Sequence, residues 1–189
     1  TNRLLDSGEV THLSLVPTML VRLLQDRNNR PFPTTLKTIL LGGAPVSDSL
    51  LQTIRRLNLP VVVSYGMTET ASQITATRLT DPPERLTTSG RILHDCEIRI
   101  EKEPRSSVGE ICVRGNVVCR GYTAGSQSSI SNDGWLLTGD IGYLDNDGYL
   151  AVLGRKDRMF ISGGENIFPE EIENAAAGSP GIVTAAVVP

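Results

Sequence analysis

Two stretches of the sequence combine residue types that can handle a nucleotide. The first, Ser64 to Gln73, places a tyrosine, a glycine, two threonines and a glutamate within six residues. The ring of Tyr65 can stack on a base, and the hydroxyl of Thr68 can donate to a phosphate oxygen. Glu69 can hold Mg²⁺ there, because Mg²⁺ prefers oxygen ligands and binds together with phosphates. A helix start would explain Thr68 and Glu69 as a cap and a first-turn acid, but it would not explain Tyr65 or Gly66.

The second stretch, Gly134 to Glu173, contains an acid and a base at the ends of short apolar runs. Asp140 follows one run and Arg155 follows another. The carboxylate of Asp140 can accept two hydrogen bonds from a ribose diol, and a turn aspartate that bonds its own backbone explains the residue equally well. The stretch lies where one kind of domain ends and another begins, and such junctions favour ligand sites.

A third loop, Gly42-Gly43-Ala44-Pro45, is rich in glycine. Glycines let a ligand approach the backbone closely, but a tight turn alone also accounts for them. Asp145-Asn146-Asp147-Gly148 is typical of a hairpin turn. It lacks the distal glutamate of a calcium loop, so we do not interpret it as a metal site.

Residues 1–80 alternate between apolar runs and helical patterns, which predicts an α/β fold. Helices are expected from Pro17 and from a cap at Ser47. Strands are expected at His12 to Val16, Leu36 to Leu41 and Val61 to Val63. This order predicts a parallel sheet with flanking helices on both faces. Ligands bind beyond the carboxyl ends of such strands, where we expect two loops, Gly42 to Pro45 and Ser64 to Gln73.

Residues 81–154 change to a β-rich pattern, and no clear helix follows Asp81-Pro82-Pro83-Glu84. Short strands at this spacing predict a small β-barrel-like subdomain or a bent sheet. The expected strands are Glu97 to Glu101, Val108 to Gly115, Val117 to Tyr122, Trp135 to Thr138, Ile141 to Leu144 and Leu150 to Leu153.

Residues 158–189 look like the start of a small α+β C-terminal domain. A strand is expected at Met159 to Ile161, a helix from Pro169 and a further strand at Ile182 to Val188. This unit is too short to bury a core of its own. We therefore expect the domain to continue past Pro189.

The composition excludes several classes of protein. The 189 residues are 39% hydrophobic and 21% charged, which is typical of soluble globular domains. A net charge of -3 gives no electrostatic reason to expect nucleic acid or an anionic membrane as a partner. No apolar run approaches the length of a membrane span, and the first residues do not form a signal peptide. Three cysteines without a CxxC pair indicate reduced thiols, so we expect a cytoplasmic protein.

Five motifs in one order resemble the adenylate-forming superfamily of acyl-CoA synthetases, adenylation domains and luciferases. They are LLGGAP (Leu40 to Pro45), YGMTETA (Tyr65 to Ala71), GEICVRGNVVCRGY (Gly109 to Tyr122), LTGD (Leu137 to Asp140) and GRKDRMFISGGENIFPEEIE (Gly154 to Glu173). The resemblance covers nearly the whole chain from about Thr11. THLSLVPTML (Thr11 to Leu20) and YGMTETASQI (Tyr65 to Ile74) are similar to the o-succinylbenzoate-CoA ligase subfamily of menaquinone synthesis.

The resemblance implies two half-reactions and three small-molecule partners. A carboxylic acid attacks the α-phosphate of ATP, which gives an acyl-adenylate and pyrophosphate, and the thiol of CoA then displaces AMP. The carboxylate is already a nucleophile, so such a protein mainly positions it and neutralises charge. ATP, Mg²⁺ and CoA are the implied cofactors and co-substrates, and a homodimer is left open.

The motifs also imply roles for single residues. Tyr65 would stack on adenine, Thr68 would hold the α-phosphate and Glu69 would hold Mg²⁺, while Asp140 and Arg155 would bind the ribose hydroxyls. Gly42, Gly43, Ala44, Gly66 and Met67 would line the nucleotide and acyl pocket.

The implied moving parts lie beyond residue 154. Asp157 would be the pivot within a hinge at residues 155–157, and Ser162, Gly163, Gly164 and Glu165 would line the CoA tunnel. Arg22, on the helix after Val16-Pro17-Thr18, is a candidate for binding a second substrate carboxylate. A solvent-facing helical arginine explains Arg22 equally well.

The chain departs from the family pattern at both ends. The phosphate loop is expected upstream of Thr1 and the catalytic lysine downstream of Pro189, and Ser64 stands where glycine is common. We therefore expect this stretch alone to have little or no ligase activity. Two alternatives remain, an adenylation domain that loads a carrier protein and a non-catalytic nucleotide-binding remnant.

Overall fold

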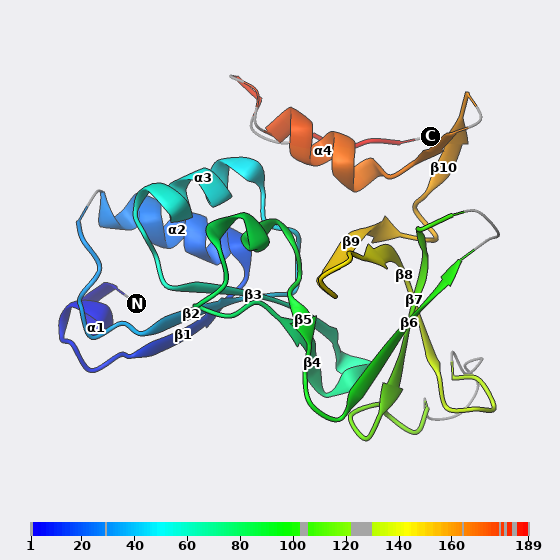
Figure 1. The fold of residues 1–189 in the computed structure, drawn as a ribbon. Coiled ribbons are helices and arrows are strands. Elements are labelled where there is room, and N and C mark those ends of the chain that lie inside the picture. The colour runs from blue at the N-terminus through cyan, green and yellow to red at the C-terminus, as the bar shows by residue number, and fades with distance from the viewer. Residues whose placement is uncertain are drawn as a thin grey trace.

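A computed structural model describes residues 2–28, 30–102, 106–121, 130–163, 165–177, 179, 181–182 and 185–188. Its strands form a five-stranded sheet, a four-stranded sheet and a two-stranded pair (Figure 1). In chain order the elements are α1 (Asn2–Asp6), β1 (His12–Leu15), α2 (Pro17–Arg27), β2 (Thr38–Leu41), α3 (Asp48–Arg56), β3 (Val61–Met67), the 3-10 turn η1 (Thr68–Thr70), β4 (Ser72–Ala76), the 3-10 helix η2 (Pro83–Thr87), β5 (Arg91–Ile92), β6 (Cys96–Lys102), β7 (Gly109–Gly115), β8 (Leu136–Leu144), β9 (Leu150–Arg155), β10 (Phe160–Ser162), β11 (Glu165–Ile167) and α4 (Pro169–Ala177).

The first sheet confirms the predicted α/β unit. Strands β1, β2 and β3 are parallel and adjacent, and α2 and α3 connect them. Pro17 opens α2, and the Ser47 hydroxyl caps α3 by accepting from the backbone N–H of Leu50 at 3.4 Å. Both helices lie on the same face of the sheet (Figure 1). We predicted helices on both faces of the sheet, but α2 and α3 cover one face. Both connections are right-handed crossovers that advance in the same direction, and such crossovers place their helices on the same side of a sheet.

The main hydrophobic core lies between these helices and the sheet. Leu20, Ile39, Leu41 and Ile54 are at most 1% exposed, and they belong to one cluster with Val61 and Val63. Burying one such side chain stabilises the fold by about 1.5–3 kcal/mol. The core therefore fixes where the carboxyl ends of β1, β2 and β3 meet.

The stretch Ser64 to Gln73 is a hairpin, and the expectation that it forms a loop is wrong. Strand β3 continues to Met67, and β4 returns antiparallel to it after η1. The buried hydroxyl of Thr70 accepts from the N–H of Met67 at 3.1 Å and lies 3.2 Å from the carbonyl oxygen of Ser72. A Cβ at Gly66 would lie 1.7 Å from that same oxygen, so only glycine fits there.

The β-rich part is an antiparallel sheet in the order β6-β7-β8-β9. The strands expected at 135–138 and 141–144 are one strand, β8, because Gly139 continues it at φ +73. The strand expected at 117–122 is wrong for its described residues, which leave β7 in a turn where the N–H of Val118 donates to the carbonyl of Gly115 at 3.1 Å. The turn at 145–148 is confirmed, since Asp145 accepts from the N–H groups of Asp147 and Tyr149, each at 2.9 Å.

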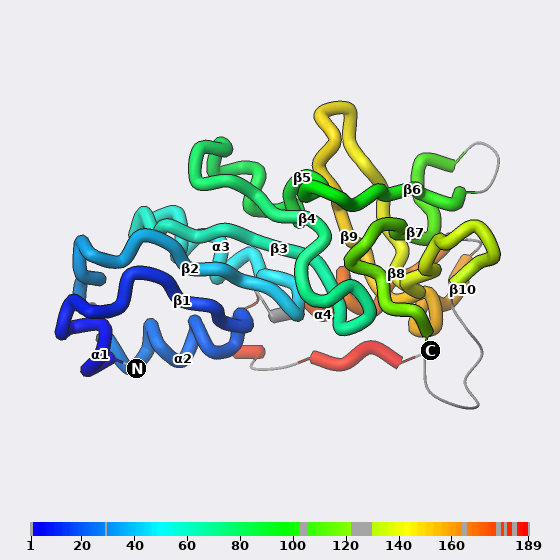
Figure 2. Tube along the Cα trace, turned by 90° about the horizontal axis from the view of Figure 1, so that it is seen from below, coloured from blue at the N-terminus to red at the C-terminus, as the bar shows by residue number. Residues whose placement is uncertain are grey.

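A short backbone link fixes the second sheet beside the first. The backbone groups of Leu150 in β9 bond to Gly90 and Ser89, each at 2.8 Å, directly before β5. Seen from below, β1 to β5 lie side by side and the chain then passes into β6 (Figure 2). The link places β8 and β9 next to the β3–β4 hairpin.

The end of the described chain contains β10, β11 and α4. The helix begins at Pro169 as predicted, with Glu170 and Glu171 in its first turn. The strand expected at 182–188 is wrong, because its described residues, 182 and 185–188, are not in a strand. No described helix is long and apolar enough to cross a membrane.

Candidate functional site

A cavity of about 420 Å³ lies at the carboxyl ends of the three parallel strands. The predicted residues that line it are Gly42, Gly43, Gly66, Met67 and Thr68, together with Val16 and Met19 at the start of α2. Glycines on two sides leave backbone exposed to a ligand. The cavity therefore lies at the edge of the sheet where the strand order predicted a ligand.

A larger cavity, of about 720 Å³, lies at the opposite end of the same strands. It is bounded by the last turns of α2 and α3 and by Leu36 and Pro60, which precede β2 and β3. None of the residues predicted for the nucleotide site lines it. Size alone therefore does not identify the site, because the chemistry lies at the carboxyl ends.

Three predicted residues from two sheets lie in contact with one another, although none of them lines the smaller cavity. The hydroxyl of Tyr65 in β3 donates to Oδ2 of Asp140 in β8 at 2.6 Å, although the two residues are 75 positions apart. Asp140 stands opposite Arg155 across β8 and β9, and Nη1 of Arg155 lies 3.4 Å from Oδ1 of Asp140. Gly66, which follows Tyr65 directly in β3, does line the cavity, so strand β3 connects the two.

The charges and burial around the cluster indicate which of its side chains stay protonated. Burial, and then the negative charge of Asp140, raises the pKa of Tyr65 well above its usual value. The phenol therefore stays protonated and donates to Asp140. A hydrogen bond to Asp157 is the first cause of the raised pKa of Arg155, and the bond from Arg155 lowers the pKa of Asp157. The guanidinium remains charged, with Nη1 also donating to the carbonyl of Thr138 at 3.2 Å.

Glu69 lies half-buried in the turn between β3 and β4. Its backbone carbonyl accepts from the N–H of Cys119 at 2.7 Å, which ties the turn to the segment after β7. In the described part of the chain, no group of three or more His, Cys, Asp or Glu side chains could hold a metal. One carboxylate such as that of Glu69 nevertheless suits Mg²⁺, because Mg²⁺ binds through one or two carboxylates together with substrate phosphates.

Several predicted residues lie outside this assembly. Ser162 and Gly163 are exposed in the turn between β10 and β11, and Gly164 lies outside the described residues. Glu165 pairs with Ser162 at the start of β11, and neither Ser162 nor Gly163 lines the cavity. Ala44 and Arg22 are exposed and do not line it either.

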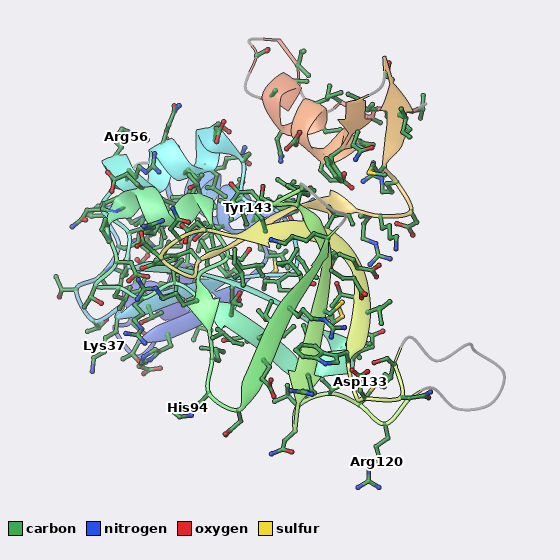
Figure 3. All side chains as sticks on the ribbon, turned by 45° about the vertical axis from the view of Figure 1, so that its right-hand side comes forward. Lys37, Arg56, His94, Arg120, Asp133 and Tyr143 are labelled. Carbon is green, nitrogen blue, oxygen red and sulfur yellow. The ribbon has the colours of Figure 1, made fainter. Side chains whose placement is uncertain are left out.

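Two polar residues to which the sequence analysis gave no role at the nucleotide site, Glu110 and Lys156, join the cluster. The buried Glu110 carboxylate accepts from Nζ of Lys156 at 2.6 Å. This contact is the first cause of the raised pKa of Lys156. Glu110 lies in the motif Gly109 to Tyr122, but that motif did not assign a role to it. Arg120, in the same motif, instead projects away from the sheet (Figure 3).

Comparison with known proteins agrees with this geometry. A family model described as AMP-binding enzyme matches residues 2–123. The chain belongs to the AMP-binding enzyme family. It is 44% identical over 187 residues to 2-succinylbenzoate–CoA ligase of Bacillus subtilis (strain 168). This match covers 95% of the chain and 38% of the ligase. The ligase of the same name from Listeria monocytogenes is 39% identical over 188 residues and is covered to 39%.

Solved structures give the same result. The chain matches o-succinylbenzoate CoA synthetase (MenE) of Bacillus subtilis in complex with the acyl-adenylate intermediate OSB-AMP, at 42% identity and a TM-score of 0.88, over 98% of this chain and 39% of that one. It also matches the amide bond synthetase McbA from Marinactinospora thermotolerans, at 29% identity and a TM-score of 0.85, over 98% of this chain and 40% of that one. The predicted family is confirmed, and the chain spans about two fifths of the length of the curated relatives it matches.

Proposed function

We propose that the chain is the central part of an ATP-dependent carboxylate–CoA ligase that acts through an acyl-adenylate. The proposed acid is an aryl acid such as o-succinylbenzoate, which places the protein in menaquinone biosynthesis. The observation that carries the proposal is the contact between Tyr65, Asp140 and Arg155. Gly66, which follows Tyr65 in β3, lines the cavity together with Gly42, Gly43 and Thr68. The two curated relatives named above are ligases for 2-succinylbenzoate.

The proposed nucleotide roles follow from the chemistry of these side chains. A ribose diol can donate to the carboxylate of Asp140 and accept from Arg155, and the ring of Tyr65 offers a face for adenine. Thr68 lines the cavity, so its hydroxyl can donate to the α-phosphate. Glu69, in the same turn, would hold Mg²⁺, which neutralises phosphate charge when it is bound.

The reaction follows from positioning more than from acid–base chemistry. The substrate carboxylate attacks the α-phosphorus of ATP, the bond from that phosphorus to the bridging oxygen breaks, and pyrophosphate leaves. The cavity at 42–43 and 66–68 would hold the acyl group next to the phosphate that Thr68 binds. Holding two reactants at attack distance supplies much of the rate in reactions of this kind.

The second half-reaction would use the part of the chain after residue 154. We propose that residues 1–80 and 81–154 form the two parts of the nucleotide site and that residues 158–189 begin a mobile lid. Asp157, within residues 155–157, would be the pivot, and Ser162 to Glu165 would reach the CoA tunnel after rotation. The exposed position of Ser162 and Gly163, away from the cavity, supports such a rotation. Arg22 stays a candidate for a second substrate carboxylate, and a cytoplasmic location would give access to ATP and CoA.

The test measures pyrophosphate release by the full-length protein with ATP and Mg²⁺. The acids are o-succinylbenzoate and a fatty acid, each with and without CoA. We expect release with o-succinylbenzoate and formation of its CoA thioester. The 189-residue chain alone should release little or none, because the phosphate loop and terminal lysine of the family are not in it.

Each other outcome identifies a different protein. Release with the fatty acid but not with o-succinylbenzoate would contradict the substrate. Release without any CoA thioester would favour an adenylation domain that loads a carrier protein. No release with either acid, from a protein that still binds ATP, would favour a nucleotide-binding remnant.

A further inference from the structure

The carboxylate of Glu110 contacts both strands that carry the proposed ribose ligands. Its side chain is 9% exposed, and its Oε2 lies 2.6 Å from Nζ of Lys156. Its Oε1 accepts from the backbone N–H of Gly139 at 3.1 Å. Gly139 directly precedes Asp140, and Lys156 directly follows Arg155. One buried carboxylate therefore holds the neighbour of each proposed ligand.

The segment that Glu110 holds departs from regular strand pairing. Strand β7 pairs with β8 at Glu110–Ile141 and again at Cys112–Leu137, so Ile111 alone faces the three residues 138–140. Such a bulge removes ladder hydrogen bonds and turns side chains to new directions. The carboxylate of Glu110 supplies an acceptor for the N–H of Gly139 at this bulge.

Further contacts make the bulge and the arginine dependent on each other. The N–H of Lys156 donates to the carbonyl of Gly139 at 2.8 Å. A Cβ added at Gly139 would lie 3.0 Å from Nη2 of Arg155, so the guanidinium lies directly against this backbone. A shift of the bulge would therefore move both Asp140 and Arg155.

We propose that Glu110 is a positioning residue that holds the 138–140 bulge and Lys156, so that Asp140 and Arg155 face the ribose of a nucleotide. The inference rests on the proposed function, since it assigns Glu110 to the same site. Glu110 does not touch the nucleotide. Its effect is transmitted through Gly139 to Asp140, and through Lys156 to Arg155.

The test separates a ribose effect from a loss of fold. The dissociation constants of ATP and of 2′,3′-dideoxy-ATP are measured for the full-length protein and for Glu110→Ala, Glu110→Gln and Glu97→Gln. Glu97 is a matched control, because it pairs with Arg114 at 2.6 Å in the same antiparallel sheet. Glu110→Gln retains an oxygen that can accept from Gly139 but loses the charge that pairs with Lys156.

We expect Glu110→Ala to raise the dissociation constant of ATP about tenfold, which is the size expected when a hydrogen bond to a charged group is lost. The dissociation constant of 2′,3′-dideoxy-ATP should change by less than about twofold, because this nucleotide lacks the hydroxyls that Asp140 and Arg155 would bind. The preference for ATP should therefore fall about tenfold. Glu110→Gln should retain part of the preference, and Glu97→Gln should retain all of it.

Two results would overturn the inference. If Glu110→Ala or Glu110→Gln weakened the binding of ATP and of 2′,3′-dideoxy-ATP equally, Glu110 would only support the fold. If the preference for ATP were unchanged in both variants, Glu110 would not act on the ribose site. Should Glu110→Ala fail to fold, the comparison of Glu110→Gln with Glu97→Gln decides. A wild-type protein that binds no ATP would instead overturn the proposed function, and the ribose role with it.

Discussion

Replacing Tyr65 with phenylalanine removes one oxygen from the centre of the candidate site. That oxygen donates to Asp140 at 2.6 Å, and the side chain of Asp140 is 13% exposed. A hydrogen bond to a charged group contributes about 1.5–3 kcal/mol to stability. Arg155 remains 3.4 Å from the carboxylate, so Asp140 keeps a charged partner. We therefore expect a loss at the lower end, about 1.5 kcal/mol of unfolding free energy.

The assay is urea unfolding of wild type, Tyr65→Phe and Tyr143→Phe. Tyr143 is a matched control, since it is half-buried in β8 and its hydroxyl shows no hydrogen-bond partner among the described residues. The pKa of Tyr65 is raised by burial and by Asp140, so the phenol is protonated at neutral pH and the loss should be the same from pH 6 to 9. A loss below about 0.5 kcal/mol, or one equal to that of Tyr143→Phe, would refute the importance of this bond.

The same variant separates the two roles proposed for Tyr65. Phenylalanine retains a ring that can stack on adenine, whereas Tyr65→Leu does not. Adenine binding should therefore survive in Tyr65→Phe and weaken in Tyr65→Leu, in binding assays on the full-length protein. Equal weakening in both variants would assign the whole effect to the hydroxyl.

Three further perturbations test the hinge, the hairpin and the acid stability. Asp157→Pro should leave pyrophosphate release nearly intact and block thioester formation, because proline fixes φ at the pivot, and equal loss of both steps would argue against a hinge. Gly66→Ala should lower the unfolding free energy in urea by more than about 2 kcal/mol, since its Cβ would lie 1.7 Å from the carbonyl oxygen of Ser72. Gly148→Ala, with open space around it, should lower it by about 1 kcal/mol through its positive φ alone. Similar losses in the two variants would contradict the clash. The pKa of Asp145 is lowered from 3.8 by its backbone hydrogen bonds and by Arg85. The wild type should therefore be more stable than Asp145→Asn above about pH 4 and should lose that advantage as the pH falls below 3.8. An advantage that persisted to pH 2 would contradict this linkage.

The elements with strong local signals were predictable from the sequence. Pro17 and Ser47 mark helix starts by local rules, and α2 and α3 begin there. Val61 to Val63 is a strand by composition alone. The hairpin at 64–73 was not predictable, because its signals are Thr70 hydrogen bonds and a close approach to Gly66, which depend on β4 lying alongside. The strand β8 was divided in two because its Gly139 reads as a break.

The sequence by itself determined which residues could bind a nucleotide and which family the chain resembles. Motifs such as YGMTETA and LTGD act over a few neighbouring positions, so their content is visible without a fold. Only the tertiary structure decided that Tyr65 donates to Asp140 and that Glu110 bonds Lys156, pairs separated by 75 and 46 positions. Such contacts depend on strand register and on the Leu150–Gly90 link between the sheets, and both follow from packing of the whole chain, which no local pattern encodes.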